Sequence, residues 1–162
     1  MIKRNATKYL IASAAILAGA LFSTSSFVSP ARAADADLRA GYYFDASGFA
    51  LGGGLLTSLG HSGSWWFNPN LEVAFADNVN VFTVNGDVHY DLPLGESSMS
   101  WWVGGGPALL VADPDGGSSD TNFGLNILGG VGAARGGVRP FAQIKAIVSD
   151  NSETALMGGI RF

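Results

Sequence analysis

The feature that most constrains this chain is a two-residue alternation of apolar and polar side chains, repeated in eight short segments. Clusters of turn-forming residues separate these segments, which cover residues 37–44, 48–57, 65–76, 79–92, 99–111, 121–134, 138–148 and 153–162. In the fourth segment Phe82 and Val84 alternate with Thr83 and Asn85. Successive side chains of a strand point to opposite faces, so the pattern predicts β-strands with one apolar and one polar face.

The number and length of the segments favour a closed barrel. A tilted strand that crosses a bilayer has about 9 to 11 residues, and membrane barrels of this kind have an even number of strands. The chain is rich in residues typical of such sheets, with 23 glycines, ten phenylalanines, four tryptophans and four tyrosines. We therefore predict an all-β fold, an eight-stranded antiparallel up-and-down transmembrane β-barrel that follows a cleaved signal peptide.

Residues 1–33 are predicted to be that signal peptide. Lys3, Arg4 and Lys8 precede an apolar run over residues 9–22 that is too short to span a bilayer. The small residues Ala31 and Ala33 then form a cleavage pattern, so we place cleavage after Ala33 and the barrel domain at residues 34–162. An uncleaved membrane anchor is the alternative. Export followed by insertion would locate the protein in the cell outer membrane of a Gram-negative bacterium.

The charge and cysteine content of the remaining 129 residues exclude several classes of protein. Five basic residues stand against thirteen acidic ones, a formal net charge of −8, so nucleic acid is excluded as a partner. The chain has no cysteine, so disulfides cannot stabilise it in an oxidising compartment.

Charged residues inside the predicted segments share the face opposite the apolar one. The seven assigned to this face are Arg39, Glu72, Asp87, Asp91, Arg139, Lys145 and Arg161. In a membrane barrel this face lines the lumen, so we predict a lumen charge network with acids and bases on opposite walls. Glu72 and Lys145 lie equally far from the starts of their segments. Because side chains fill an eight-stranded barrel, these two should meet across the axis.

Aromatic residues on the apolar face fall into two bands. Tyr42, Phe44, Phe49, Phe75, Phe82 and Phe123 lie toward the end away from the termini, and Trp65, Tyr90, Trp101 and Phe162 lie toward the end with the termini. A soluble β-sandwich would also separate charged from apolar residues, but it has little reason to sort aromatic rings. A bilayer does, since such rings favour its interfaces. Tyr43, Trp66, Trp102 and Phe141 have lumen parity and should fill the interior.

Candidate sites for chemistry are few. His89 lies between Asp87 and Asp91 in the lumen pattern, and a serine such as Ser100 could complete a catalytic group, but a hydrogen-bonded lumen histidine is the simpler interpretation. Residues 113–120 are rich in oxygen ligands but lack the closing glutamate of a calcium loop, so we interpret them as a solvated turn. We therefore predict no catalytic residues, no metal and no cofactor.

Four stretches of the sequence resemble the small eight-stranded outer-membrane β-barrel family of the opacity-protein and OmpA-like type. They are residues 68–72, 102–106, 138–142 and 158–162. The resemblance covers the whole mature chain. It implies that Leu156, Ile160 and Phe162 form the terminal signal read by the outer-membrane assembly machinery, although Gly158 stands where a larger apolar residue is expected. It also implies outer-membrane lipid and lipopolysaccharide as surroundings and a monomeric state.

Together these observations predict a non-enzymatic outer-membrane barrel with a side-chain-filled lumen and a structural or surface-interaction role. Two alternatives remain at this point. One is a lipid-modifying or small-ligand-binding barrel, and the other is a soluble, lipocalin-like periplasmic barrel.

Overall fold

A computed structural model describes residues 34–60, 63–77, 79–95, 97–114 and 117–162. The predicted signal peptide at residues 1–33 and its cleavage site lie outside these described residues. No helix in the described part of the chain is long and apolar enough to cross a membrane.

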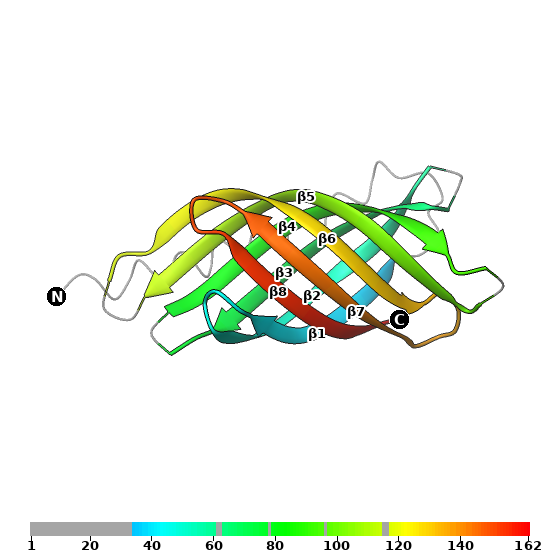
Figure 1. Cartoon of the computed structure of the whole chain (residues 1–162), viewed down its shortest axis with the longest axis horizontal. Helices are drawn as coiled ribbons and strands as arrows, with labels where there is room; N and C mark the ends of the chain where they lie inside the picture. Colours follow the sequence, from blue (N-terminus) through cyan, green and yellow to red (C-terminus); the bar gives the residue numbers. More distant parts are fainter. Residues whose placement is uncertain (1–33, 61–62, 78, 96, 115–116) are drawn as a thin grey trace. The chain divides into compact units, whose positions relative to one another are not determined.

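Eight antiparallel strands pair in chain order, and β8 pairs with β1 to close a barrel (Figure 1). The strands are β1 (Asp35–Tyr43), β2 (Gly48–Leu59), β3 (Trp65–Phe75), β4 (Val79–Pro93), β5 (Met99–Pro114), β6 (Asp120–Ala133), β7 (Arg139–Val148) and β8 (Glu153–Arg161). The predicted fold class is confirmed. The largest boundary differences are in β1, which begins two residues early, in β2, which ends two residues late, and in β5, which ends three residues late. The extra length of β5 shortens the expected link at 113–120 to residues 115–119.

The two ends of the barrel differ in the links they carry. We call the end where β1 begins and β8 ends the base, and it holds the links at residues 60–64, 94–98 and 134–138. The opposite end, the tip, holds the links at residues 44–47, 76–78, 115–119 and 149–152. The β1–β8 seam extends to the last residue at the base, because Ala36 and Phe162 exchange two backbone hydrogen bonds of 2.9 Å.

Residues that alternate in the sequence lie on opposite surfaces of the closed sheet, one facing the lumen and the other facing outward. In β7, Gln143, Lys145 and Ile147 are buried in the lumen, whereas Ile144 and Val148 are exposed on the outer surface. Because successive residues of a strand point to opposite faces, each strand contributes to both surfaces at once.

A proline in the middle of β3 is accommodated by its neighbour. Pro69 has no N–H group, so it removes one hydrogen bond from the ladder. The β2–β3 pairing is interrupted between Gly54↔Asn70 and Thr57↔Phe67, and continuing the register across this gap brings Leu55 opposite Pro69. The side-chain amide of Asn68 donates to the Leu55 carbonyl at 2.7 Å. Asn68 therefore supplies the donor that Pro69 lacks.

Inward-facing glycines lie opposite the largest lumen side chains. Trp102 in β5 pairs with Gly130 in β6, and Phe141 in β7 pairs with Gly159 in β8. A methyl group added at either glycine would collide with the aromatic ring. The narrow interior holds these rings because the facing residue has no side chain.

Candidate functional site

The carboxylate of Glu72 in β3 lies at the centre of a buried cluster. Lys145 Nζ in β7 is 2.5 Å from Glu72 Oε2, and the Tyr43 hydroxyl in β1 donates to the same oxygen at 2.6 Å. Arg39 Nη1 donates to the other oxygen, Oε1, at 3.2 Å. All four side chains are buried. A buried charge is tolerated when it is paired and hydrogen-bonded, and this carboxylate has both kinds of partner. The structure thus brings Glu72 and Lys145 together inside the barrel.

Arg39 extends this cluster toward the base. Its Nε and Nη2 donate to the two oxygens of Asp37 at 2.8 and 2.7 Å, and Nη2 also donates to Asn68 Oδ1 at 2.8 Å. Sequence reasoning left Asp37 out of the network. The prediction that acids and bases occupy opposite walls is therefore wrong for β1, where Asp37 is the near partner of Arg39 on the same face. The two-residue spacing was the signal that could have found it.

Asp87 belongs to a separate group of buried amides. Its two carboxylate oxygens accept hydrogen bonds from Asn70 at 2.9 Å and from Asn126 at 2.6 Å. Asn85 connects the same two residues, because it donates to Asn70 Oδ1 and accepts from Asn126 Nδ2, both at 2.9 Å. No ion pair to Asp87 is present within the described residues. The predicted network therefore includes Asp87 only as a hydrogen-bond acceptor.

The remaining three predicted lumen charges lie toward the base, each in a different setting. Asp91 Oδ1 is 2.8 Å from His89 Nδ1, and Arg139 Nη2 is 2.5 Å from Asp35 Oδ2. The Arg161 guanidinium lies over the ring of Trp102, 4.2 Å from its centroid. Of the seven predicted charges, Arg39, Glu72 and Lys145 form one cluster and the other four do not join it by direct contact.

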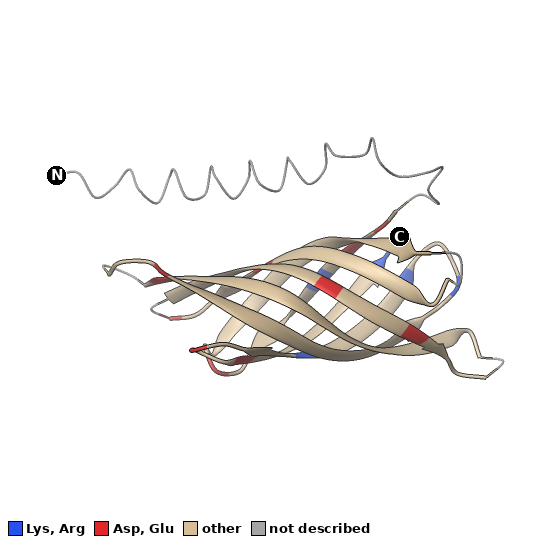
Figure 2. Cartoon of the chain, turned by 90° about the horizontal axis from the view of Figure 1, so that it is seen from above, with Lys and Arg blue, Asp and Glu red and all other residues tan. Residues whose placement is uncertain are grey.

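Charge is distributed unevenly between the two ends of the barrel. In Figure 2 most basic residues lie toward the C-terminal end, whereas acidic residues occur at both ends and dominate the opposite one. The acids in or beside the described tip links are Asp45, Asp77, Asp113, Asp120, Asp150 and Glu153. Asp113 is also the one charged residue with outward parity in the described strands, a consequence of the extra length of β5.

Toward the tip, the lumen is filled by apolar side chains, of which sequence analysis placed only Tyr43 in the interior. The buried cluster consists of Tyr43, Ala50, Ala74, Val81, Ala108, Leu110, Ile147, Ala155 and Met157. A second cluster of Trp102, Leu128 and Phe141 lies nearer the base. The interior is therefore packed with side chains on both sides of the Glu72 cluster.

The candidate catalytic group does not assemble. His89 is buried and pairs with Gly104 in the β4–β5 register, whereas Ser100 pairs with Pro93, four residues farther along β4. His89 Nδ1 contacts Asp91, but its Nε2 has no hydrogen-bond partner among the described residues. Ser100 is therefore not placed opposite the imidazole, and the contact that the structure describes is the His89–Asp91 pair.

The oxygen-rich turn near the tip forms local contacts only. Ser119 Oγ donates to Asp113 Oδ1 at 2.9 Å, and Asp120 accepts from Asn122 at 3.0 Å. Asp115 and Gly116 lie outside the described residues. Among the residues that the structure describes, no group of three His, Cys, Asp or Glu side chains is placed to hold a metal ion.

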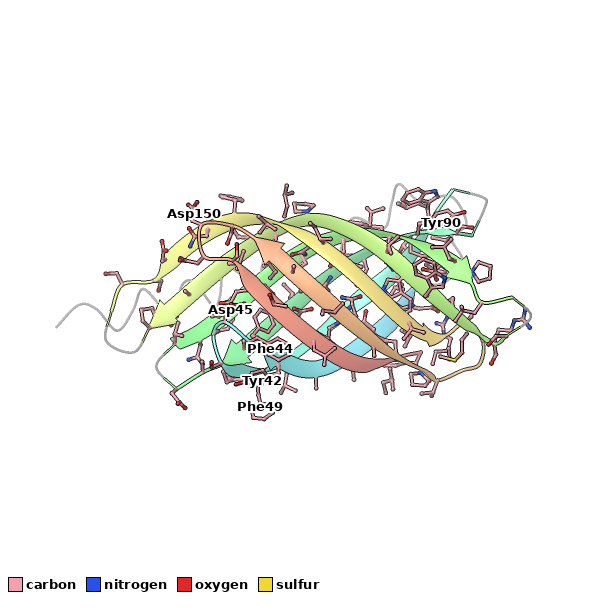
Figure 3. All side chains as sticks on the ribbon, viewed as in Figure 1. Tyr42, Phe44, Asp45, Phe49, Tyr90 and Asp150 are labelled. Atoms are coloured by element: carbon pink, nitrogen blue, oxygen red, sulfur yellow. The ribbon has the colours of Figure 1, made fainter. Side chains whose placement is uncertain are left out.

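The ten predicted band residues lie on the outer surface. Near the tip, Tyr42 packs edge-on against Phe44 and Phe49, with ring centroids 5.5 and 5.4 Å apart (Figure 3). Phe75 is the register partner of Phe49, which continues the row onto β3. The other members at this level are Phe82 and Phe123.

The second band lies near the base. Trp65 and Tyr90 are register partners whose rings are 5.1 Å apart, and Trp101 and Phe162 are exposed on the outer surface at the same end. The residues of the predicted terminal signal, Leu156 and Ile160, are exposed on the outer surface of β8.

Comparison with known proteins supports the fold. No protein-family description and no curated protein matches the sequence. Solved structures do match. The N-terminal β-barrel domain of OprF from Pseudomonas aeruginosa shares 15% identity with a TM-score of 0.67, covering 80% of this chain and 95% of that one. Neisserial surface protein A shares 19% identity with a TM-score of 0.63, covering 79% and 94%.

A third match is to PagL, described as an outer-membrane enzyme. It shares 12% identity with a TM-score of 0.52, covering 79% of this chain and 98% of that one. Proteins with different roles therefore share this architecture, and the likeness concerns the fold. The chain has the eight-stranded antiparallel barrel fold of the small outer-membrane β-barrel proteins.

Proposed function

We propose that this chain is a non-enzymatic outer-membrane β-barrel protein of a Gram-negative bacterium, with a closed lumen and a structural or surface-interaction role. The observation that carries the proposal is the inverted distribution of polarity across the barrel wall. Large apolar side chains cover the outside, among them Leu38, Leu51, Leu71, Val103, Leu125, Ile127, Ile144 and Leu156, while ion pairs are buried inside. Such a surface aggregates in water but suits lipid.

The two aromatic bands support the same placement. They lie toward the two ends of the apolar surface, where a bilayer has its interfaces, and amphipathic rings favour that depth. Lipid and lipopolysaccharide are the proposed surroundings of this surface. By the usual arrangement of such barrels, the base faces the periplasm and the tip faces the outside.

The packing of the lumen supports a structural role rather than transport. The Glu72 cluster joins β1, β3 and β7, and apolar clusters lie on either side of it. An eight-stranded barrel is just wide enough for side chains to fill it. The tip links are short, so a surface interaction would use the acidic rim and not long loops.

Two measurements test the proposal. Fractionation with a heat-modifiable gel shift should find the folded protein in the outer membrane, and planar bilayers should record no steady ion conductance. Recovery as a soluble periplasmic protein, or a large and stable open channel, would contradict it.

The alternatives fit less well. A lipocalin-like carrier needs an apolar interior, whereas here buried ions occupy the middle of the lumen and the apolar belt faces outward. A lipid-modifying enzyme is represented among the structural matches by PagL, but Ser100, the serine considered as its nucleophile, pairs with Pro93 and not with His89. Unchanged lipid A after deletion of the gene is the result expected for a non-enzyme.

Assembly through the terminal aromatic is part of the proposal. Replacing Phe162 by alanine keeps the two backbone hydrogen bonds to Ala36 but removes the ring. We expect a smaller folded population in the outer membrane and more periplasmic proteolysis. Phe123→Ala is the matched control, because Phe123 is also exposed on the outer surface but lies inside the chain. Equal assembly of both variants would show that the terminal ring is not read.

A further inference from the structure

Two arginines at the base face each other without a shared counter-ion. Arg139 and Arg161 are register partners in the β7–β8 pair, and both have lumen parity. Like charges directly opposite on adjacent strands destabilise a sheet. Arg161 is only 7% exposed, yet no hydrogen bond or ion pair joins its guanidinium to any described residue. A buried guanidinium without an acceptor is costly, so this position favours an added negative group.

The acidic residues nearby are already engaged with other partners. Asp35 is 2.5 Å from Arg139 Nη2, and Asp37 accepts two hydrogen bonds from Arg39. Asp91 contacts His89 Nδ1 at 2.8 Å. Asp37 and Asp91 lie close enough to act on the charge of Arg161, but each contacts another side chain directly, and no described carboxylate forms a hydrogen bond or ion pair with Arg161.

Several N–H groups in this region are buried and have no acceptor. They include Nε of Arg139, Nε of Arg161 and the side-chain amide nitrogen of Gln143. Trp102 connects two of these residues, because its Nε1 donates to Gln143 Oε1 at 3.2 Å and the Arg161 guanidinium lies over its ring. The Arg161 guanidinium also lies over the ring of Phe141, 5.0 Å from its centroid. The rings hold Arg161 in place but cannot accept its hydrogen bonds.

From this juxtaposition we propose that Arg139 and Arg161 form an oxyanion site at the base of the lumen, which takes a phosphate group. A phosphate offers several acceptor oxygens, and guanidinium groups bind it through paired hydrogen bonds. The site opens toward the base through Arg139 and Asp35, whose side chains are 17% and 30% exposed, whereas Arg161 is 7% exposed. The inference does not depend on the proposed membrane role.

The test is calorimetric titration of the protein as cells produce it, folded in a nonionic maltoside detergent, with inorganic phosphate. The wild type should show saturable one-to-one binding. Arg161→Gln and Arg139→Gln should each weaken binding about tenfold or more, because each removes charge-assisted hydrogen bonds. Arg161→Lys keeps the charge but loses Nε and the planar fork, so it should weaken binding less. This variant provides the comparison if Arg161→Gln fails to fold.

Arg135→Gln is the matched control, because it removes the same charge from an exposed position in the link at residues 134–138. It should bind phosphate as the wild type does. No saturable binding by the wild type, or an equal loss in Arg135→Gln, would overturn the proposal. Adding phosphatidylglycerol to the micelles distinguishes a lipid headgroup from free phosphate. If phosphatidylglycerol weakens the binding of inorganic phosphate, the site accepts the phosphate of a lipid headgroup. If phosphate binding is unchanged, the site accepts free phosphate.

Discussion

Ile144 and Lys145 are neighbours in β7, yet one is 56% exposed on the outer surface and the other is 0% exposed in the lumen. Ile144 belongs to a belt of apolar side chains that we place in lipid. Lys145 has one specific partner, the Glu72 carboxylate at 2.5 Å. The outer surface is defined by a general property, apolarity, whereas the lumen is defined by particular contacts. The same substitution should therefore have different effects on the two faces.

The largest difference should come from removing one charge of the central pair. Lys145→Met leaves Glu72 buried with Arg39 as its only cation, and loss of one partner of a buried pair typically costs about 3 to 5 kcal/mol. The free energy of unfolding in lipid vesicles measures this. Ile144→Met, on the other face of the same strand, should have little effect.

A double-mutant cycle with Glu72→Gln identifies the source of that loss. If the cost is the unpaired carboxylate, the double variant should lose less stability than the sum of the two single variants. A charge swap is a poorer test, since a lysine at position 72 would face Arg39. Additive losses would mean that the pair does not act as a unit.

A charge placed on the outer belt should have the next largest effect. Ile127 in β6 is 64% exposed on the outer surface, and an arginine near the bilayer midplane costs about 2 to 4 kcal/mol. Thr121→Arg is the control on the same face near the tip, where the cost should be about 0 to 1 kcal/mol. Equal costs at both positions, measured by unfolding in lipid vesicles, would argue against the proposed bilayer depth.

A smaller effect is expected at the proline of β3. Asn68→Ala leaves the Leu55 carbonyl without a donor, and an unsatisfied buried acceptor costs about 1 to 3 kcal/mol. Adding Pro69→Ala restores a backbone N–H opposite Leu55 and should recover part of the loss in equilibrium unfolding. No recovery would mean that the other contacts of Asn68, with Asp37 and Arg39, account for the cost.

The smallest effect is expected from removing one methyl group from an isoleucine on either face of β7. Ile147 is 0% exposed within the apolar cluster near the tip, so Ile147→Val should cost about 0.5 to 1.5 kcal/mol. Ile144→Val should cost almost nothing, because lipid chains fill the space that the methyl group leaves. Similar losses of unfolding free energy would show that the outer surface is packed against something more ordered than lipid.

Strand positions and the two faces were predictable because they depend on local alternation alone. Glu72 and Lys145 could also be matched, since they lie at similar depth on strands that face each other. The identity of a hydrogen-bond partner needs more than depth. The Tyr43 hydroxyl reaches Glu72, although parity assigned Tyr43 only to filling the interior.

Other lumen contacts depend on features that the alternation does not contain. Asp37 was omitted because β1 was expected to begin there, which made a lumen residue look like part of a link. The apolar cluster near the tip was not foreseen because the lumen face was identified by its polar residues, although Val81 and Ile147 share that face with Thr83 and Lys145. The proposed phosphate site depends on which side chain each aspartate of the base contacts, and sequence spacing does not determine those contacts.

The pairing of large lumen side chains with glycines has a consequence for how such a barrel changes over time. Each of these rings occupies the space that a side chain on the facing residue of the adjacent strand would take. The two pairs are Trp102 with Gly130 and Phe141 with Gly159. A larger residue at either glycine requires a smaller ring opposite, and at Gly159 the Leu38 carbonyl must shift as well; loss of a ring leaves a void that the glycine cannot fill. Diverging relatives should therefore exchange these residues two at a time, so that the pairs appear as correlated columns when their sequences are aligned.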